Sequence, residues 1–111
     1  MADSRRRFDR YLWKLDVTLM LGDRTVIAQS IDIGLGGMLL ATDENLEFGQ
    51  EFDLSFQLTD PQQTINTHAK VMWSKPGTVG ISFDALRPIE VWAMLQFFSR
   101  SGAAIDGGGA E

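Results

Sequence analysis

The sequence predicts an all-β fold, a six-stranded antiparallel β-barrel, followed by one C-terminal α-helix. Three observations lead to this prediction. Apolar and polar residues alternate strictly in several short stretches, which is typical of strands with one face in a core and one in water. Turn signals separate these stretches, and short strands on tight connections favour closure, because a closed barrel has no unpaired edges. Beyond Phe83 the apolar period becomes that of a helix.

Four of the predicted strands carry the alternation directly, as in 52–58, where Phe or Leu at every second position is separated by Asp, Ser and Gln. Two further strands flank a cluster of glycines. In chain order the predicted strands are 15–21, 24–33, 37–42, 52–58, 65–73 and 79–83. The turn signals between them are Gly22-Asp23, 34–37, 43–45, Asp60-Pro61 and Pro76-Gly77.

The helix is predicted to begin near Pro88, because proline is tolerated in a first helical turn. Glu90 in that turn suits the positive end of the helix dipole. The apolar stripe of the helix consists of Val91, Met94, Leu95 and Phe98. Trp92 and Phe97 lie beside this stripe, and they either widen it or cover a mouth of the barrel.

Charge divides the chain into an arm and a body. The first fourteen residues hold five of the ten lysines and arginines and carry a net charge of +3, whereas the other residues carry −8, for a total of −5. We expect a flexible basic arm over 1–12, the barrel with its helix over 13–100, and a disordered tail over 101–111. A short basic arm on an acidic body suggests a small anionic ligand, and a merely solvated basic terminus is the alternative.

Composition argues against several functional classes. Cysteine is absent, which removes disulfides, thiolate nucleophiles and zinc–thiolate sites. The one histidine, His68, lies on the polar face of a predicted strand, so we expect a surface residue, no metal site and no enzymatic activity. Neither a membrane span nor a secretory signal is recognisable, so we expect a cytoplasmic protein. A pI near 4.7 argues against binding to a nucleic acid polymer.

Two short segments carry the strongest functional signal. The first is RRRFDR, which contains Arg5, Arg6, Arg7 and Arg10. The second is DIGLGG, in which Asp32 is followed by Gly34, Gly36 and Gly37. Arginine binds phosphate bidentately and stacks on purines, a carboxylate matches the N1–H and N2–H of guanine, and glycine lets the backbone approach a ligand closely. Together the two segments predict a guanine nucleotide site.

The order of these segments resembles that of PilZ domains. RRRFDR precedes an alternating strand, and DIGLGGM, a V-x-W segment, a G-I-S-F segment and the helix follow, over about residues 4–100. The motif of that family is R-x-x-x-R followed by D/N-x-S-x-x-G. In this chain the matching residues are Arg6, Arg10, Asp32 and Gly37. The resemblance implies a bacterial cyclic di-GMP receptor with a six-stranded barrel and a C-terminal helix.

The implied function is that of a receptor or adaptor, which orders its arginine arm on cyclic di-GMP and signals to a partner protein. Gly34 stands where the family has serine. Loss of one neutral hydrogen bond costs about 0.5–1.5 kcal/mol, about three- to tenfold in affinity, so we expect weaker binding. The main alternative is a PilZ-like interaction module without nucleotide binding. A barrel that binds single-stranded nucleic acid is disfavoured, because cations and aromatic residues are not interleaved here.

Trp73 ends an inward-facing alternation, so we expect it to pack in the core, with a position at the rim of the ligand site as the alternative. The four arginines of the arm match the four negative charges of two stacked ligands, and both one and two ligands per chain fit the sequence. The chain is expected to be a monomer or a weak homodimer. Its effector protein is not identified by the sequence.

Overall fold

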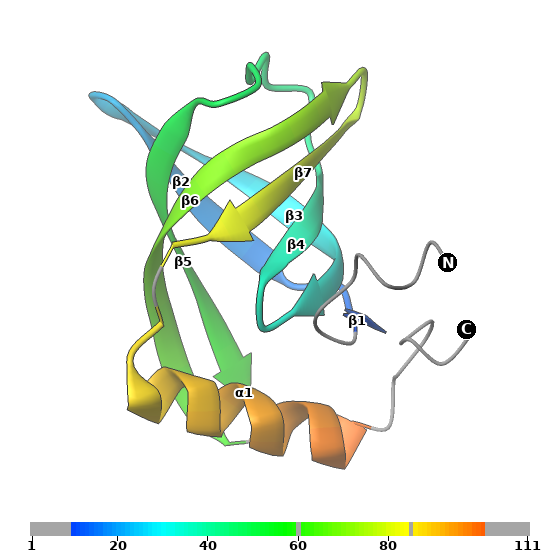
Figure 1. The fold of residues 1–111 in the computed structure, drawn as a ribbon, viewed down its shortest axis with the longest axis vertical. Helices are drawn as coiled ribbons and strands as arrows, with labels where there is room; N and C mark the ends of the chain where they lie inside the picture. The colour runs from blue at the N-terminus through cyan, green and yellow to red at the C-terminus, as the bar shows by residue number, and fades with distance from the viewer. Residues whose placement is uncertain (1–9, 60, 85, 102–111) are drawn as a thin grey trace.

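The computed structural model describes residues 10–59, 61–84 and 86–101. It contains seven strands and one helix (Figure 1). The elements are β1 (Arg10–Leu12), β2 (Asp16–Leu21), β3 (Arg24–Gly34), β4 (Gly37–Ala41), β5 (Glu51–Thr59), β6 (Gln62–Lys75), β7 (Thr78–Phe83) and α1 (Pro88–Ser101). No helix in this part of the chain has the length and apolar character needed to cross a bilayer.

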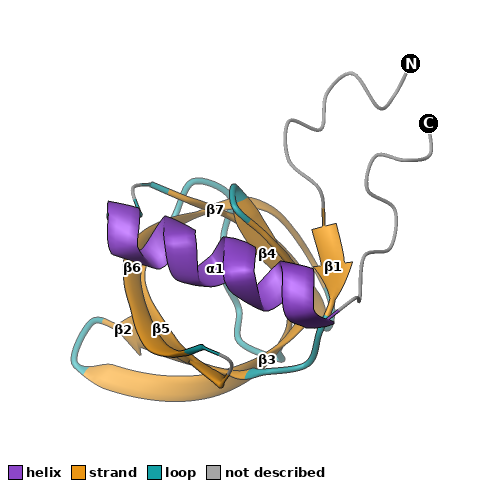
Figure 2. Cartoon of the chain, turned by 90° about the horizontal axis from the view of Figure 1, so that it is seen from below, coloured by secondary structure: helices purple, strands orange, loops and turns teal. Residues whose placement is uncertain are grey.

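Six of the strands form a closed antiparallel barrel. The sheet order is β1-β3-β2-β5-β6-β7-β4, and β4 also pairs with β3, which closes the ring of β2 to β7 (Figure 2). β1 lies outside this ring of six and pairs only with β3. The predicted barrel and its C-terminal helix are therefore confirmed. Closure leaves few unpaired edges on the barrel strands.

The core follows from the alternation that the sequence shows. Along β5 every second residue is buried, and the same holds for β2 as far as Leu19 and for β6 from Ile65 to Val71. These side chains meet inside the barrel with those of β4 and β7 and with one face of α1. The largest fully buried apolar side chains are Leu19, Ile33, Met38, Leu40, Leu54, Leu58, Ile65 and Met94.

The ends of the chain differ in part from expectation. The arm was expected over 1–12, but Arg10–Leu12 form β1 and extend the sheet into that range. At the other end, α1 includes Ser101, the first residue assigned to the tail. The rest of the predicted arm, 1–9, and the rest of the predicted tail, 102–111, lie outside the described residues.

α1 lies across one end of the barrel (Figure 2). Its buried face consists of Glu90, Ala93, Met94, Phe97 and Phe98. The predicted stripe was wrong at Leu95, which is 49% exposed, while Phe97 is buried and Trp92 is exposed. The reason is that α1 contacts β5 and β6 on one side and residues near β1 on the other, which turns Phe97 inward. Phe97 thus covers the barrel mouth, one of the two predicted alternatives.

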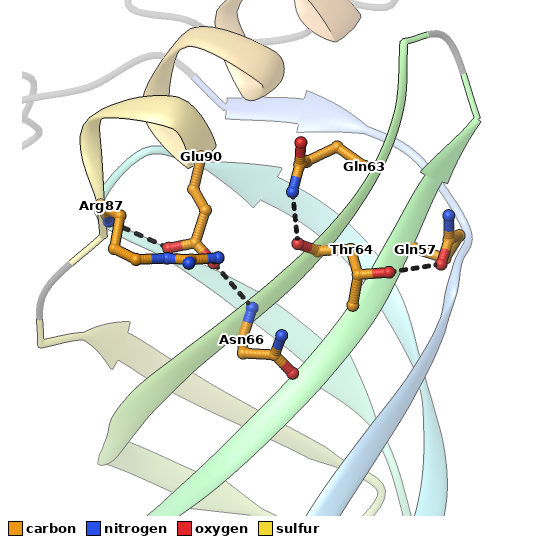
Figure 3. Close-up of polar contacts among 6 residues, drawn as sticks. All are labelled: Gln57, Gln63, Thr64, Asn66, Arg87 and Glu90. Carbon is orange, nitrogen blue, oxygen red and sulfur yellow. Dashed lines mark hydrogen bonds and ion pairs between the residues drawn. The ribbon is translucent and has the colours of Figure 1, made fainter.

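A buried carboxylate fixes the N-terminal end of α1 (Figure 3). Glu90 is 0% exposed, and its oxygens accept hydrogen bonds from the backbone N–H groups of Arg87 and Asn66, both at 2.9 Å, and from Arg87 Nη2 at 3.0 Å. Burial acts to raise the pKa of Glu90, but these hydrogen bonds and the guanidinium charge outweigh it and hold the pKa below its usual value. Glu90 therefore joins the first helical turn to β6.

Candidate functional site

β1 brings the two predicted binding segments together. It runs antiparallel to β3, with Arg10 opposite Gly34, Tyr11 opposite Ile33 and Leu12 opposite Asp32. The last arginine of the basic segment is therefore a cross-strand neighbour of the segment that follows Asp32. Arg5, Arg6 and Arg7 lie outside the described residues. Of the four predicted arginines, the structure places the backbone of Arg10 at the site.

A β-bulge turns Asp32 to the outer face of the barrel. Ala28 and Ser30 are buried, so an uninterrupted alternation would direct residue 32 inward as well. The register with β4 shifts between Ser30 and Asp32, which leaves Ile31 without a register partner in β4. Beyond the shift Ile33 is buried and Asp32 is half-buried on the outer face. Bulges commonly reorient a side chain in this way next to a binding site.

Ser30 stabilises the chain at the break between β1 and β2. Both strands pair with β3, and residues 13–15 separate them. The buried Ser30 hydroxyl accepts a hydrogen bond from Leu15 N at 2.9 Å and donates one to the Trp13 carbonyl. Sequence reasoning missed this residue, although a serine on the inward face of a predicted strand is a signal that a buried polar contact is needed.

Trp73 lies on the outer face, so the expected core position was wrong. Trp73 is 42% exposed. The register of β6 with β7 shifts between Val71 and Trp73, which reverses the alternation. Trp73 then faces Gly80, where a Cβ atom would lie 2.4 Å from the indole Nε1. The indole therefore occupies the space that a side chain at position 80 would need, with Lys75 Nζ 5.5 Å from the ring centroid.

The two bulges place Asp32 and Trp73 in one row across the barrel. From the pairing registers, Trp73 is opposite Gly80, Gly80 is opposite Leu39, Leu39 is opposite Asp32, and Asp32 is opposite Leu12. We call these five residues the outer row. Three strand spacings, roughly 14 Å, separate the backbones of Asp32 and Trp73. The outer row therefore presents a carboxylate and an aromatic face on the same side of the sheet.

The glycines near Asp32 differ in what they do. Gly34 lies in the sheet opposite Arg10, and the Gly36 carbonyl accepts a hydrogen bond from Phe83 N at 2.9 Å. A Cβ atom on Gly37 would lie 2.0 Å from the Ile81 carbonyl oxygen, so β4 and β7 can approach only if residue 37 is glycine. Positive φ angles occur among the described glycines at Gly22, Gly49 and Gly77 instead. The need for glycine at 37 thus comes from packing within the barrel.

His68 lies apart from the outer row, between two carboxylates of β5. Its Nδ1 is 2.8 Å from Asp53 Oδ1 and its Nε2 is 2.8 Å from Glu51 Oε1. The hydrogen bond to Asp53, then that to Glu51, raises the pKa of His68, because both stabilise the imidazolium. No group of three or more His, Asp or Glu residues in the described part of the chain is arranged to hold a metal ion.

The sequence matches the family model of the PilZ domain over residues 4–100. No curated protein matches the chain in sequence.

Several solved structures share the fold. MotI/DgrA of Bacillus subtilis, an inhibitor of motility, superposes with a TM-score of 0.76 at 22% identity, covering 88% of this chain and 51% of that one. YcgR of Escherichia coli in complex with c-di-GMP gives 0.72 at 20% identity, covering 88% and 46%. The PilZ domain of YcgR with c-di-GMP gives 0.65 at 16% identity, covering 88% and 98%. The chain thus spans about half the length of MotI and YcgR.

Proposed function

This chain belongs to the PilZ domain family, and we propose that it is a receptor for cyclic di-GMP, bound between the arginine segment and the outer face of β3. The observation that carries the proposal is the pairing of β1 with β3. It sets Arg10 opposite Gly34 and Leu12 opposite Asp32, so both parts of the sequence motif meet at one place. Two of the structures that share the fold, YcgR and its PilZ domain, contain c-di-GMP.

The chemistry of this place suits the proposed ligand. Asp32 is half-buried on the outer face, where its carboxylate can accept hydrogen bonds from the N1–H and N2–H of a guanine. Arg6 and Arg10 supply the guanidinium groups that bind phosphate and stack on a face of the guanine, and Arg5 and Arg7 add positive charge. Trp73, at the far end of the outer row, offers an aromatic surface at the rim.

The output of the proposed receptor is a change at its surface. Binding fixes the arginine segment against β3, which costs roughly 1–2 kcal/mol of backbone entropy per residue ordered, and charge-assisted contacts to the phosphates offset this cost. The ordered segment then forms, together with the ligand, a new surface for an effector protein.

Calorimetric titration with cyclic di-GMP tests the proposal. We expect saturable binding, weakened at least tenfold by Arg10→Ala and by Asp32→Ala, because each removes a contact to a charged or hydrogen-bonding group of the ligand. His68→Ala is the matched control, since His68 lies on β6 away from the outer row and contacts Asp53 and Glu51 of β5. The stoichiometry at the plateau distinguishes one ligand from two. Absence of saturation at ligand concentrations on the order of 100 μM would refute the receptor and favour an interaction module without nucleotide, for which Gly34 is the supporting feature.

A further inference from the structure

A shallow hollow of about 660 Å³ lies in the outer surface at the break between β1 and β2. Its volume is within the range of small-molecule sites. The hollow is lined by Leu12, Trp13, Lys14, Gln29, Ser30, Ile31 and Ala41. None of these residues belongs to the arginine motif or to the motif that begins at Asp32.

The hollow is continuous with the proposed ligand site. Leu12 lines it and is at the same time the cross-strand partner of Asp32. Gln29 of β3 is paired with Ala41 of β4, further along these two strands from Asp32. Ile31, which the bulge leaves without a register partner in β4, also lines the hollow. One local irregularity therefore shapes both the position of Asp32 and the hollow beside it.

The lining has the chemistry of a nucleotide subsite. Among the described residues that line the hollow, Lys14 alone is charged, although the chain carries −5 overall. Leu12 and Ile31 provide apolar surface for a base. Gln29 donates from Nε2 to Asp16 Oδ1 at 3.1 Å, which leaves its amide oxygen as an acceptor for an N–H of the base. A cation, an acceptor and an apolar surface fit a purine that carries a phosphate.

We propose that this hollow is a second nucleotide subsite, in which Lys14 pairs with a phosphate of the bound cyclic di-GMP while a guanine lies against Leu12 and Ile31. The inference rests on the proposed function and extends it, because it assigns a binding role to Lys14 and to the β1–β2 break. Asp32 reads one guanine, and the hollow takes the next one along β3.

The first test compares Lys14→Ala, Lys14→Arg and Lys70→Ala by calorimetric titration with cyclic di-GMP. Lys14→Ala should lower the affinity about tenfold, because it removes a charge-assisted contact. Lys14→Arg should retain most of it, since guanidinium also pairs with phosphate. Lys70→Ala is the matched control, because Lys70 is exposed on β6 opposite Glu51, and this substitution should leave the affinity unchanged. Equal affinities for Lys14→Ala and Lys70→Ala would overturn the inference.

The second test fills the hollow. Ala41 is exposed, so Ala41→Phe adds a ring to the hollow without disturbing the core, and we expect at least a tenfold loss of affinity with an unchanged melting temperature. In a double variant that carries both Trp73→Phe and Trp92→Phe, Trp13 remains as the single tryptophan. Its fluorescence emission should change on titration with cyclic di-GMP. If Trp13 emission does not change and Ala41→Phe binds with wild-type affinity, the subsite alone is overturned, provided that Asp32→Ala still weakens binding at least tenfold. If the wild-type chain binds no cyclic di-GMP, the proposed function and the subsite both fail.

Discussion

Two halves of the barrel are built differently. β2, β5 and the first part of β6 pair without any register shift, and their alternation is unbroken. In the other half, the pairing register shifts between β3 and β4 and again between β6 and β7, and residues 13–15 interrupt the strand structure between β1 and β2. Both halves place large side chains in the core, and the bulges of the irregular half also turn Asp32 and Trp73 outward. The proposed binding groups therefore lie in the irregular half, and stability and binding can be tested separately.

The largest effect is expected in the regular half. Leu54 is fully buried on β5, so Leu54→Ala should lower the free energy of unfolding by about 2–5 kcal/mol through lost burial and the cavity left behind. Denaturant titration measures this change. At a temperature where the variant remains folded, its affinity for cyclic di-GMP should equal that of the wild type. A selective loss of affinity without loss of stability would contradict the division between the two halves.

Two glycines of the irregular half differ in what a Cβ atom on each would meet. Gly37→Ala places a Cβ atom 2.0 Å from the Ile81 carbonyl, a backbone group that cannot move aside, and should destabilise the protein by about 1–3 kcal/mol or more. Gly80→Ala meets the Trp73 indole instead, a side chain that can rotate away. We expect it to cost less stability but to change the fluorescence of Trp73. If both variants lose the same stability, the indole is held as rigidly as the backbone.

In the irregular half, Gly34→Ser is expected to raise the affinity for cyclic di-GMP. Serine restores the hydroxyl of the family motif at the position opposite Arg10, and one added hydrogen bond should raise the affinity for cyclic di-GMP about three- to tenfold. Calorimetric titration measures this, with Gly34→Ala as the matched control that adds a side chain without a hydroxyl. Equal affinities for the two variants would show that the hydroxyl makes no contact with the ligand.

The smallest effect concerns pH and the regular half. Asp53 and Glu51 raise the pKa of His68 in the folded state above its unfolded value of about 6.5. The resulting stabilisation is fully present below that unfolded value and is lost as the pH rises through the folded pKa. His68→Gln should therefore remove part of the decrease in stability above about pH 6.5. Denaturant titrations across this range measure it, and an unchanged pH profile would show that the imidazole gains nothing from its two neighbours.

The sequence predicted the regular half well, because strict alternation leaves one way to bury an apolar face. Phe52, Leu54, Phe56 and Leu58 are buried, and the residues between them are not, as the period of two requires. The irregular half was predicted less completely. A bulge adds one residue without a signature in the apolar pattern, so Trp73 was expected to face inward. Leu95 was misplaced for a related reason, since the face that a helix buries depends on its neighbours as well as on its own residues.

The candidate site was predictable in its components but not in its geometry. Asp32 and the arginines were recognisable from their spacing and from the chemistry of phosphate and guanine. The pairing of Arg10 with Gly34 was not, because it depends on a three-residue strand inside a segment expected to be a flexible arm. Lys14 and Gln29 carried no motif, and only the hollow that they line draws attention to them.

The two ends of α1 are attached by unlike forces. Glu90 anchors the first turn to β6 through one hydrogen bond, from Asn66 N, and accepts two more from Arg87. The last turns instead rest on β1 and on Trp13 through ring contacts, Tyr11 with Phe98 at 4.2 Å and Trp13 with Phe97 at 5.1 Å between centroids. Tyr11 lies between Arg10 and Leu12, so a change in the position of β1 would also change the ring contact that holds Phe98 in the last turns of α1. The opposite face of α1 carries the half-exposed side chains of Ile89, Trp92 and Leu95, so the helix that packs on β1 also contributes apolar surface to the outside of the molecule.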